Sequence, residues 1–205
     1  MNKSLTVAAL LLYCNVLWSQ QPQDVQNSYQ ITGAAKLGSA VLNTLDLENF
    51  SGDVYVSEVL VGYNIKNKLK ISTGLALLRF NSNYFENDQQ FGFESDFIQV
   101  PLKFNFGYGL LKAPNFENLD FVLGFGFLGN YHLSETIANS DTSFENDFQG
   151  WHFGLMAEFG LELKLNSNIG FGLFFENNFA NSSFADNDKI RLRNNLIKLS
   201  FGYNF

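Results

Sequence analysis

The sequence ends in Leu196-Ile197-Lys198-Leu199-Ser200-Phe201-Gly202-Tyr203-Asn204-Phe205, where large apolar residues alternate with polar or small ones. Successive side chains of a β-strand point to opposite faces, so this stretch predicts a strand with one apolar and one polar face. An amphipathic helix would instead repeat its apolar residues every three or four positions. The carboxyl terminus of the chain is therefore expected to be a long amphipathic strand.

The same alternation occurs in seven earlier segments, and the connections between segments are short and long in turn. The segments are Tyr29–Leu37, Val54–Ile65, Leu69–Phe80, Ile98–Leu110, Leu119–Phe127, Trp151–Leu165 and Ile169–Phe175. The short connections are 66–68, 112–118 and 166–168, and the long ones are 39–53, 81–95, 133–149 and 180–192. Short turns at one end and longer loops at the other are typical of up-and-down transmembrane barrels. We therefore predict an all-β, eight-stranded antiparallel up-and-down transmembrane β-barrel.

Packing decides which face of this barrel is apolar. Eight strands enclose a lumen that side chains only just fill, and the large apolar residues of all the segments could not pack there at normal density. The opposite face is rich in glycine, including Gly124, Gly126 and Gly160, which suits a crowded interior. The apolar face is therefore expected to point outward against lipid. Aromatic residues at the strand ends would form the interfacial girdles, namely Tyr63, Tyr108, Tyr203 and Phe205 at one end and Tyr55, Tyr131 and Trp151 at the other.

Residues 1–19 have the pattern of a cleaved signal peptide, and 20–205 would form the single barrel domain. Lys3 supplies the positive charge, Leu5–Leu17 the apolar stretch and Ser19 the small residue before the cut. A lipoprotein signal at Cys14 is disfavoured by the bulky Tyr13 before it. Cleavage would remove one lysine and no acid, which changes the formal net charge from -7 to -8. Nucleic acid is an unfavourable partner for so acidic a chain, and no cofactor is expected.

The segment Phe97-Ile98-Gln99-Val100-Pro101-Leu102-Lys103-Phe104, the glycine-rich 154–165 strand and the final Tyr203-Asn204-Phe205 resemble small outer-membrane β-barrels of Bacteroidota, the PorT-like group. The resemblance covers essentially the whole chain after the signal peptide. It implies export to the bacterial outer membrane, where the partners would be lipids and lipopolysaccharide. Phe205 resembles the terminal signal read by the barrel-assembly machinery, although the glycine that usually lies further upstream is here Gly202. Such families include adhesins and components of protein secretion systems, so an envelope or secretion partner is also implied.

Six charged residues fall on the inward face at the same distance from the strand ends. They are Lys36, Glu58, Lys103, Glu158, Glu176 and Lys198. Isolated buried charges are unfavourable, and three lysines with three glutamates would form a neutral belt. The spacing predicts a belt that plugs the lumen at mid-height, with Lys198 beside Glu176 or Glu58. Unrelated, hydrated lumen charges remain the alternative.

Pro101 lies on the inward face within a predicted strand. Proline cannot donate a hydrogen bond to a neighbouring strand, and a closed barrel has no free edge. We therefore expect a β-bulge or the frayed start of the strand at this position.

Enzymatic chemistry would need a nucleophile and a base in one place. The chain has only His132 and His152, which fall at the ends of adjacent strands, with Ser134 and Glu135 close to the first. Neither this set nor a metal site with two histidines shows a specific spacing, so no catalytic or metal residue is predicted. Arg79 and Arg193 fall on the outward face near the loops, where they would either contact lipopolysaccharide phosphates or extend into the loops.

The sequence therefore predicts a non-enzymatic outer-membrane barrel with a plugged lumen, acting through its external loops or as a partner-binding scaffold. An accessory role in protein secretion is the first alternative, by the PorT-like resemblance. A narrow channel and a lipid-modifying enzyme are the remaining alternatives.

Overall fold

A computed structural model describes residues 28–43, 50–65, 68–86, 89–113, 116–138, 143–146, 150–166, 168–183 and 191–205. The predicted signal peptide, 1–19, lies outside these residues. No helix long and apolar enough to cross a membrane occurs in the ranges just given.

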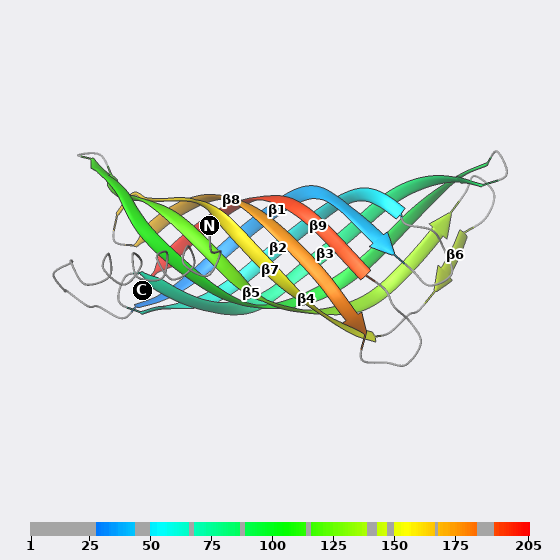
Figure 1. Ribbon diagram of the computed structural model, residues 1–205, viewed down its shortest axis with the longest axis horizontal. Coiled ribbons are helices and arrows are strands. Elements are labelled where there is room, and N and C mark those ends of the chain that lie inside the picture. The colour runs from blue at the N-terminus through cyan, green and yellow to red at the C-terminus, as the bar shows by residue number, and fades with distance from the viewer. Residues whose placement is uncertain are drawn as a thin grey trace, which may run out of the picture.

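The described residues form a closed, tilted ring of antiparallel strands (Figure 1). The strands are β1 (Ser28–Asn43), β2 (Phe50–Ile65), β3 (Leu69–Glu86), β4 (Gln89–Ala113), β5 (Phe116–Ala138), β7 (Gly150–Lys164), β8 (Ile169–Ser183) and β9 (Arg191–Asn204). Each strand of the ring pairs with its neighbours in the chain, and β1 pairs with β9 to close it. A short strand, β6 (Ser143–Asn146), pairs with the end of β5 outside the ring. The prediction of an eight-stranded antiparallel up-and-down barrel is confirmed.

The first and last strands join at one end of the barrel. The backbone N–H of Tyr29 donates to the carbonyl of Phe205 at 3.3 Å, and the N–H of Phe205 donates to the carbonyl of Tyr29 at 3.0 Å. We call this the turn end, because the short connections lie there, and the opposite end the loop end. The alternating carboxyl-terminal segment is thus the strand that closes the barrel.

The strand register fixes the width of the lumen. A row of paired residues that starts at Tyr29 and runs once around the ring returns to the same strand at Ser39, ten residues further along. The row passes through Tyr63, Ile71, Phe104, Phe125, Ala157, Asn177 and Asn195. A shear of ten over eight strands corresponds to a strand tilt of about 40° and a lumen that side chains fill.

The outward face is apolar, as expected. Leu75, Leu77 and Leu199 each expose 62% of their surface, and outward phenylalanines on β5, β7, β8 and β9 expose about half. Aromatic pairs lie at both ends of this band, with ring centroids 5.2 Å apart for Tyr29 and Tyr63 and 5.4 Å apart for Tyr131 and Trp151. A soluble monomer rarely exposes so continuous an apolar surface.

Several predicted loops are strand instead. The connection expected over 81–95 is a continuous hairpin in which β3 and β4 remain paired as far as Glu86 and Gln89. Likewise β5 continues to Ala138, and β6 was not foreseen. Beyond the apolar band both faces of a strand are polar, so the alternation of apolar and polar residues stops. The backbone hydrogen bonds between strands do not depend on this alternation and continue. The sequence pattern therefore marked the apolar band and not the ends of the strands.

The expectation for Pro101 is wrong. Strand β4 begins at Gln89, so Pro101 is not near its start, and the nearby register shift comes instead from an extra residue in β5, Leu133, opposite the Asp96/Phe97 step. The pairing of β3 with β4 is interrupted opposite Pro101, and the register is the same on both sides of the gap. The missing N–H thus removes local pairing without displacing the strands.

An outward charge at mid-height tests the lipid-facing direction of this band. Leu199 follows the mid-lumen residue Lys198, so Leu199→Arg should lower the free energy of unfolding in lipid vesicles by about 2–4 kcal/mol, as expected at a bilayer midplane. Tyr203→Arg on the same face of β9 lies at the turn end and should change it by no more than about 1 kcal/mol. If a urea titration showed equal effects of the two substitutions, Leu199 would not lie deeper in the bilayer than Tyr203, and the expected position of the apolar band would be wrong.

Candidate functional site: a charge network across the lumen

The structure brings the six predicted lumen charges together at mid-height. They come from six strands: Lys36 from β1, Glu58 from β2, Lys103 from β4, Glu158 from β7, Glu176 from β8 and Lys198 from β9. None exposes more than 4% of its surface. Three positive and three negative side chains therefore share one dry region of the lumen.

Lys36 and Lys103 connect the glutamates of opposite walls. The ammonium of Lys36 donates to Glu58 Oε2 and Glu176 Oε1, both at 2.8 Å. The ammonium of Lys103 lies 2.9 Å from Glu58 Oε2, 3.1 Å from Glu176 Oε2 and 3.8 Å from Glu158 Oε2. Each of these lysines is shared between carboxylates of different strands, so the network spans the lumen.

Lys198 completes the network with a different partner from the expected one. Its ammonium donates to Glu158 Oε2 at 2.8 Å, whereas the sequence placed it beside Glu176 or Glu58. The same ammonium lies 4.5 Å from the ring centroid of Phe174, a cation–π distance. Counting residues from the strand ends gave the height of Lys198 but not the direction of its side chain.

Like charges are neighbours along the wall of the barrel. Lys36 pairs in register with Lys198, and Glu158 pairs with Glu176. Like charges directly opposite one another on paired strands are destabilising. Lys103 compensates the two glutamates from across the lumen, and Glu58 on the neighbouring strand β2 compensates Lys36. The network therefore holds the walls together across the lumen as well as along them.

Two amide side chains donate hydrogen bonds to the carboxylates, and a glycine leaves room for one of these contacts. Asn105 donates to Glu158 Oε1, and Asn178 donates to Glu176 Oε1 at 3.0 Å. Gly124 leaves the space that these groups occupy, since a Cβ there would lie 2.6 Å from both Asn105 Nδ2 and Glu158 Cγ. Further hydrogen bonds to a carboxylate favour its charged form.

An apolar cluster lies on the loop side of the network, inside the lumen. Its members are Ala40, Leu42, Phe50, Val54, Val56, Ala76, Leu78, Phe80, Phe93, Phe97, Leu192 and Leu196. The rings of Phe50 and Phe93 stack with centroids 5.0 Å apart, and Phe80 is fully buried against Phe93. The sequence pattern indicated a small and polar inward face and did not predict this layer. Apolar residues at inward positions such as Leu78 and Phe80 were the signal that could have shown it.

His132 and His152 are buried on adjacent strands, as their positions suggested. Ser95 Oγ lies 2.7 Å from His132 Nε2, so the serine hydroxyl that pairs with the histidine is that of Ser95, whereas Ser134 contacts the ring through its backbone. The ring of Phe97 stacks on His132 at 4.6 Å, which covers this pair. Among the described residues, no group of three histidine, cysteine or acidic side chains could hold a metal ion.

The two outward arginines differ in their surroundings. Arg79 forms a bidentate salt bridge with Asp96, in which Nε donates to Oδ1 at 2.9 Å and Nη2 donates to Oδ2 at 3.0 Å. Its Nε also lies 3.1 Å from Glu94 Oε1. Its guanidinium is therefore already held by two acids of β4. Arg193 has no ion-pair partner within the part of the chain that is described.

Comparison with known proteins shows the fold and no family. No protein-family model and no curated protein sequence matches the chain. Among solved structures, Neisserial surface protein A is similar over 86% of this chain and 97% of its own, with 14% identity and a TM-score of 0.53. The N-terminal β-barrel domain of OprF from Pseudomonas aeruginosa has 16% identity, coverages of 89% and 100% and a TM-score of 0.44. The first likeness agrees with the barrel architecture described above.

A double-mutant cycle measures the coupling within the network. Lys198→Met leaves Glu158 without its nearest cation, so it should lower the free energy of unfolding by about 3–5 kcal/mol. Adding Glu158→Gln removes the uncompensated charge and should restore most of that loss, as measured by urea titration in lipid vesicles.

The matched control is the pair of Lys164 and Asp120 at the turn end, which are 2.8 Å apart and whose side chains expose 27% and 10%, against 5% and 1% for Lys198 and Glu158. The double variant Lys164→Met with Asp120→Asn should show a smaller coupling than the lumen pair, because water reaches the Lys164 ammonium and screens the interaction in part. Additive effects at Lys198 and Glu158 would show that the two charges do not stabilise each other.

Proposed function

We propose that this chain is a non-enzymatic integral protein of the bacterial outer membrane with a lumen closed by side chains, acting through its external loops or as a scaffold for a partner protein. The observation that carries the proposal is the filled lumen. A charge network and an apolar cluster lie in series inside the barrel, while the outward face carries the exposed apolar band.

The membrane location is supported by the direction of the apolar side chains. A closed barrel satisfies all its backbone hydrogen bonds within the protein, which is one of the two ways a chain can cross a bilayer. The turn end, where both β1 begins and β9 ends, would face the periplasm, and export would use the predicted signal peptide. Phe205 at the end of the closing strand would serve as the signal for the barrel-assembly machinery.

A narrow channel is the less favoured function because two different barriers obstruct the lumen. The ammonium of Lys103 bridges glutamates from three strands, and on the loop side of it the apolar cluster fills the lumen together with buried polar side chains such as Gln99 and Asn130. An ion would have to displace the network and also lose its own hydration.

A lipid-modifying enzyme is supported only by the pair of Ser95 and His132. Both side chains expose 1% of their surface and point into the lumen, behind Phe97. A substrate carbonyl needs access to the nucleophile, and the buried pair offers none in this arrangement. We therefore retain the non-enzymatic proposal.

An accessory role in protein secretion is the second candidate, and it rests on the PorT-like resemblance of the 97–104 segment and the chain end. A barrel without an open lumen suits a scaffold role, because its working surface would be its loop end. Deletion of the gene followed by quantification of secreted proteins separates the two candidates. Unchanged secretion would exclude the secretion role and leave the closed barrel in place.

Planar-bilayer recording tests the closed lumen. The unmodified chain should show no conductance steps, and Phe80→Ala with Phe93→Ala should also remain silent, because the charge network still spans the lumen. Adding Lys103→Ala removes the side chain that bridges the walls and should produce steps. Conductance in the unmodified chain would contradict the proposal, and conductance without the Lys103 substitution would show that the network is not a barrier.

A further inference from the structure

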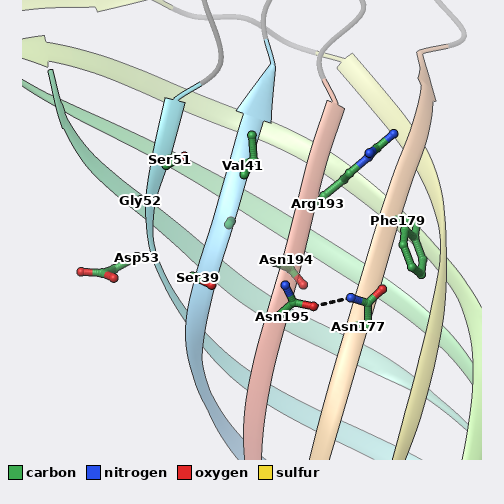
Figure 2. A pocket seen from close by; sticks show the side chains of 11 residues that line it. Ser39, Val41, Ser51, Gly52, Asp53, Asn177, Phe179, Arg193, Asn194 and Asn195 are labelled. Atoms are coloured by element: carbon green, nitrogen blue, oxygen red, sulfur yellow. Dashed lines mark hydrogen bonds between the residues drawn. The ribbon is translucent and has the colours of Figure 1, made fainter.

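A polar notch interrupts the apolar band on the outside of the barrel, across β8, β9, β1 and the start of β2 (Figure 2). It is an open hollow of about 540 Å³, which is within the range of small-molecule sites. Its floor consists of outward side chains in two rows, Asn177, Asn195 and Ser39 in one and Phe179, Arg193 and Val41 in the other. Directly toward the turn end the same strands present Phe175, Ile197 and Leu37, which are exposed and apolar.

Two amides in the notch have unused hydrogen-bonding capacity. Asn177 donates to Asn195 Oδ1, which leaves Asn177 Oδ1 buried without a partner and the amide hydrogens of Asn195 available. Exchanging the oxygen and nitrogen of both side chains reverses their roles, but the pair still has one unused acceptor and one unused donor group. Within an apolar band there is little water to satisfy such groups. A ligand that fits must offer both a donor and an acceptor at this level.

Arg193 supplies a cation directly above the amides. Figure 2 shows its side chain extending from β9 toward the strand ends, while Asp53, which also lines the notch, lies on β2 on the far side of β1 from Arg193. The guanidinium has no acidic partner among the described residues, in contrast to Arg79 with Asp96 and Glu94. A planar guanidinium is well suited to hold a phosphate through two hydrogen bonds.

We propose that this notch binds one outer-leaflet lipid of a specific chemistry, a phosphorylated glucosamine lipid with amide-linked chains, the kind that anchors lipopolysaccharide. The inference rests on the proposed membrane location. Its acyl chains lie against Phe175, Ile197 and Leu37, its amide or hydroxyl groups pair with Asn177 and Asn195, and its phosphate meets Arg193.

The spacing along the strands matches the order of groups in such a lipid. Ile197, Asn195 and Arg193 are successive outward residues of β9, and each step of two residues advances about 6.6 Å along the strand. With a tilt of about 40° this is about 5 Å along the barrel axis, so the apolar, amide and guanidinium levels follow one another in short, equal steps. A glycerophospholipid offers only acceptor carbonyls at the linkage level, so it would leave the unpaired oxygen of the amide pair unsatisfied.

Native mass spectrometry of the detergent-solubilised barrel measures this preference directly. The probes are bisphosphorylated lipid A and dioleoylphosphatidylglycerol, which shares the anionic phosphate but has no amide. The unmodified chain should bind lipid A about tenfold or more tightly than the phospholipid, the factor expected from additional hydrogen bonds, one of them charge-assisted. Arg193→Gln should weaken lipid A binding by about tenfold.

Asn177→Leu with Asn195→Leu should abolish the preference for lipid A. These substitutions replace polar groups by apolar ones on a lipid-facing surface, so the barrel should be as stable as before or more so. Loss of binding therefore cannot come from unfolding. Arg79→Gln, on β3 and outside the notch, is the matched control and should leave the affinity unchanged.

Equal affinity of the unmodified chain for the two lipids would overturn the proposed site. So would an effect of Arg79→Gln as large as that of Arg193→Gln, or displacement of the lipid by inorganic phosphate at equal concentration. A chain that inserts into bilayers but shows no lipid preference refutes the notch and leaves the proposed function standing. A chain that does not insert refutes the proposed function itself.

Discussion

Three ammonium groups and three carboxylates meet in the lumen of this barrel out of contact with water, and buried charges are tolerated only where each is compensated. The structure meets this requirement with lysines that bridge opposite walls, Lys36 between Glu58 and Glu176 and Lys103 among all three glutamates. The narrowness of an eight-stranded ring makes these bridges possible, because side chains from facing strands can touch. The neighbouring lumen positions must then be small to leave room for the charged side chains, as at Gly124 beside Glu158.

The two faces of the wall follow from this arrangement. The lumen holds a charge network and, toward the loop end, an apolar cluster around Phe80 and Phe93 beside buried polar side chains such as Gln99 and Asn130. The outward face carries the apolar band, which polar residues interrupt at Asn177, Asn195 and Arg193. A protein closed inside in this way can act only through its outer wall and its ends. The lipid notch and the long β3–β4 hairpin are therefore the surfaces of interest.

The alternation of segments such as 196–205 was enough to predict the ring, because a single periodicity determines both the strand and its faces. The six network residues could be placed at one height because they share one distance from the strand ends. The choice of Glu158 as the partner of Lys198 could not be predicted, since it depends on shear and on side-chain direction across the lumen. The inward apolar cluster was missed because Leu78 and Phe80 interrupt a face that had been assigned as small and polar. The pairing of Ser95 with His132 joins two strands whose register is shifted by Leu133, which leaves no trace in the sequence pattern.

The central claim is that the lumen is closed at the level of the network, and cysteine accessibility at Ser200 tests it most directly. Ser200 faces the lumen on β9, two residues from Lys198 toward the turn end, and Cys14 is the sole cysteine of the sequence, so Ser200→Cys in a Cys14→Ser background gives a single thiol. In vesicles with uniformly oriented barrels, a charged thiol reagent should modify this cysteine from the turn end and not from the loop end. Equal modification from both ends would contradict the account, because it would require a path for a charged molecule through the network.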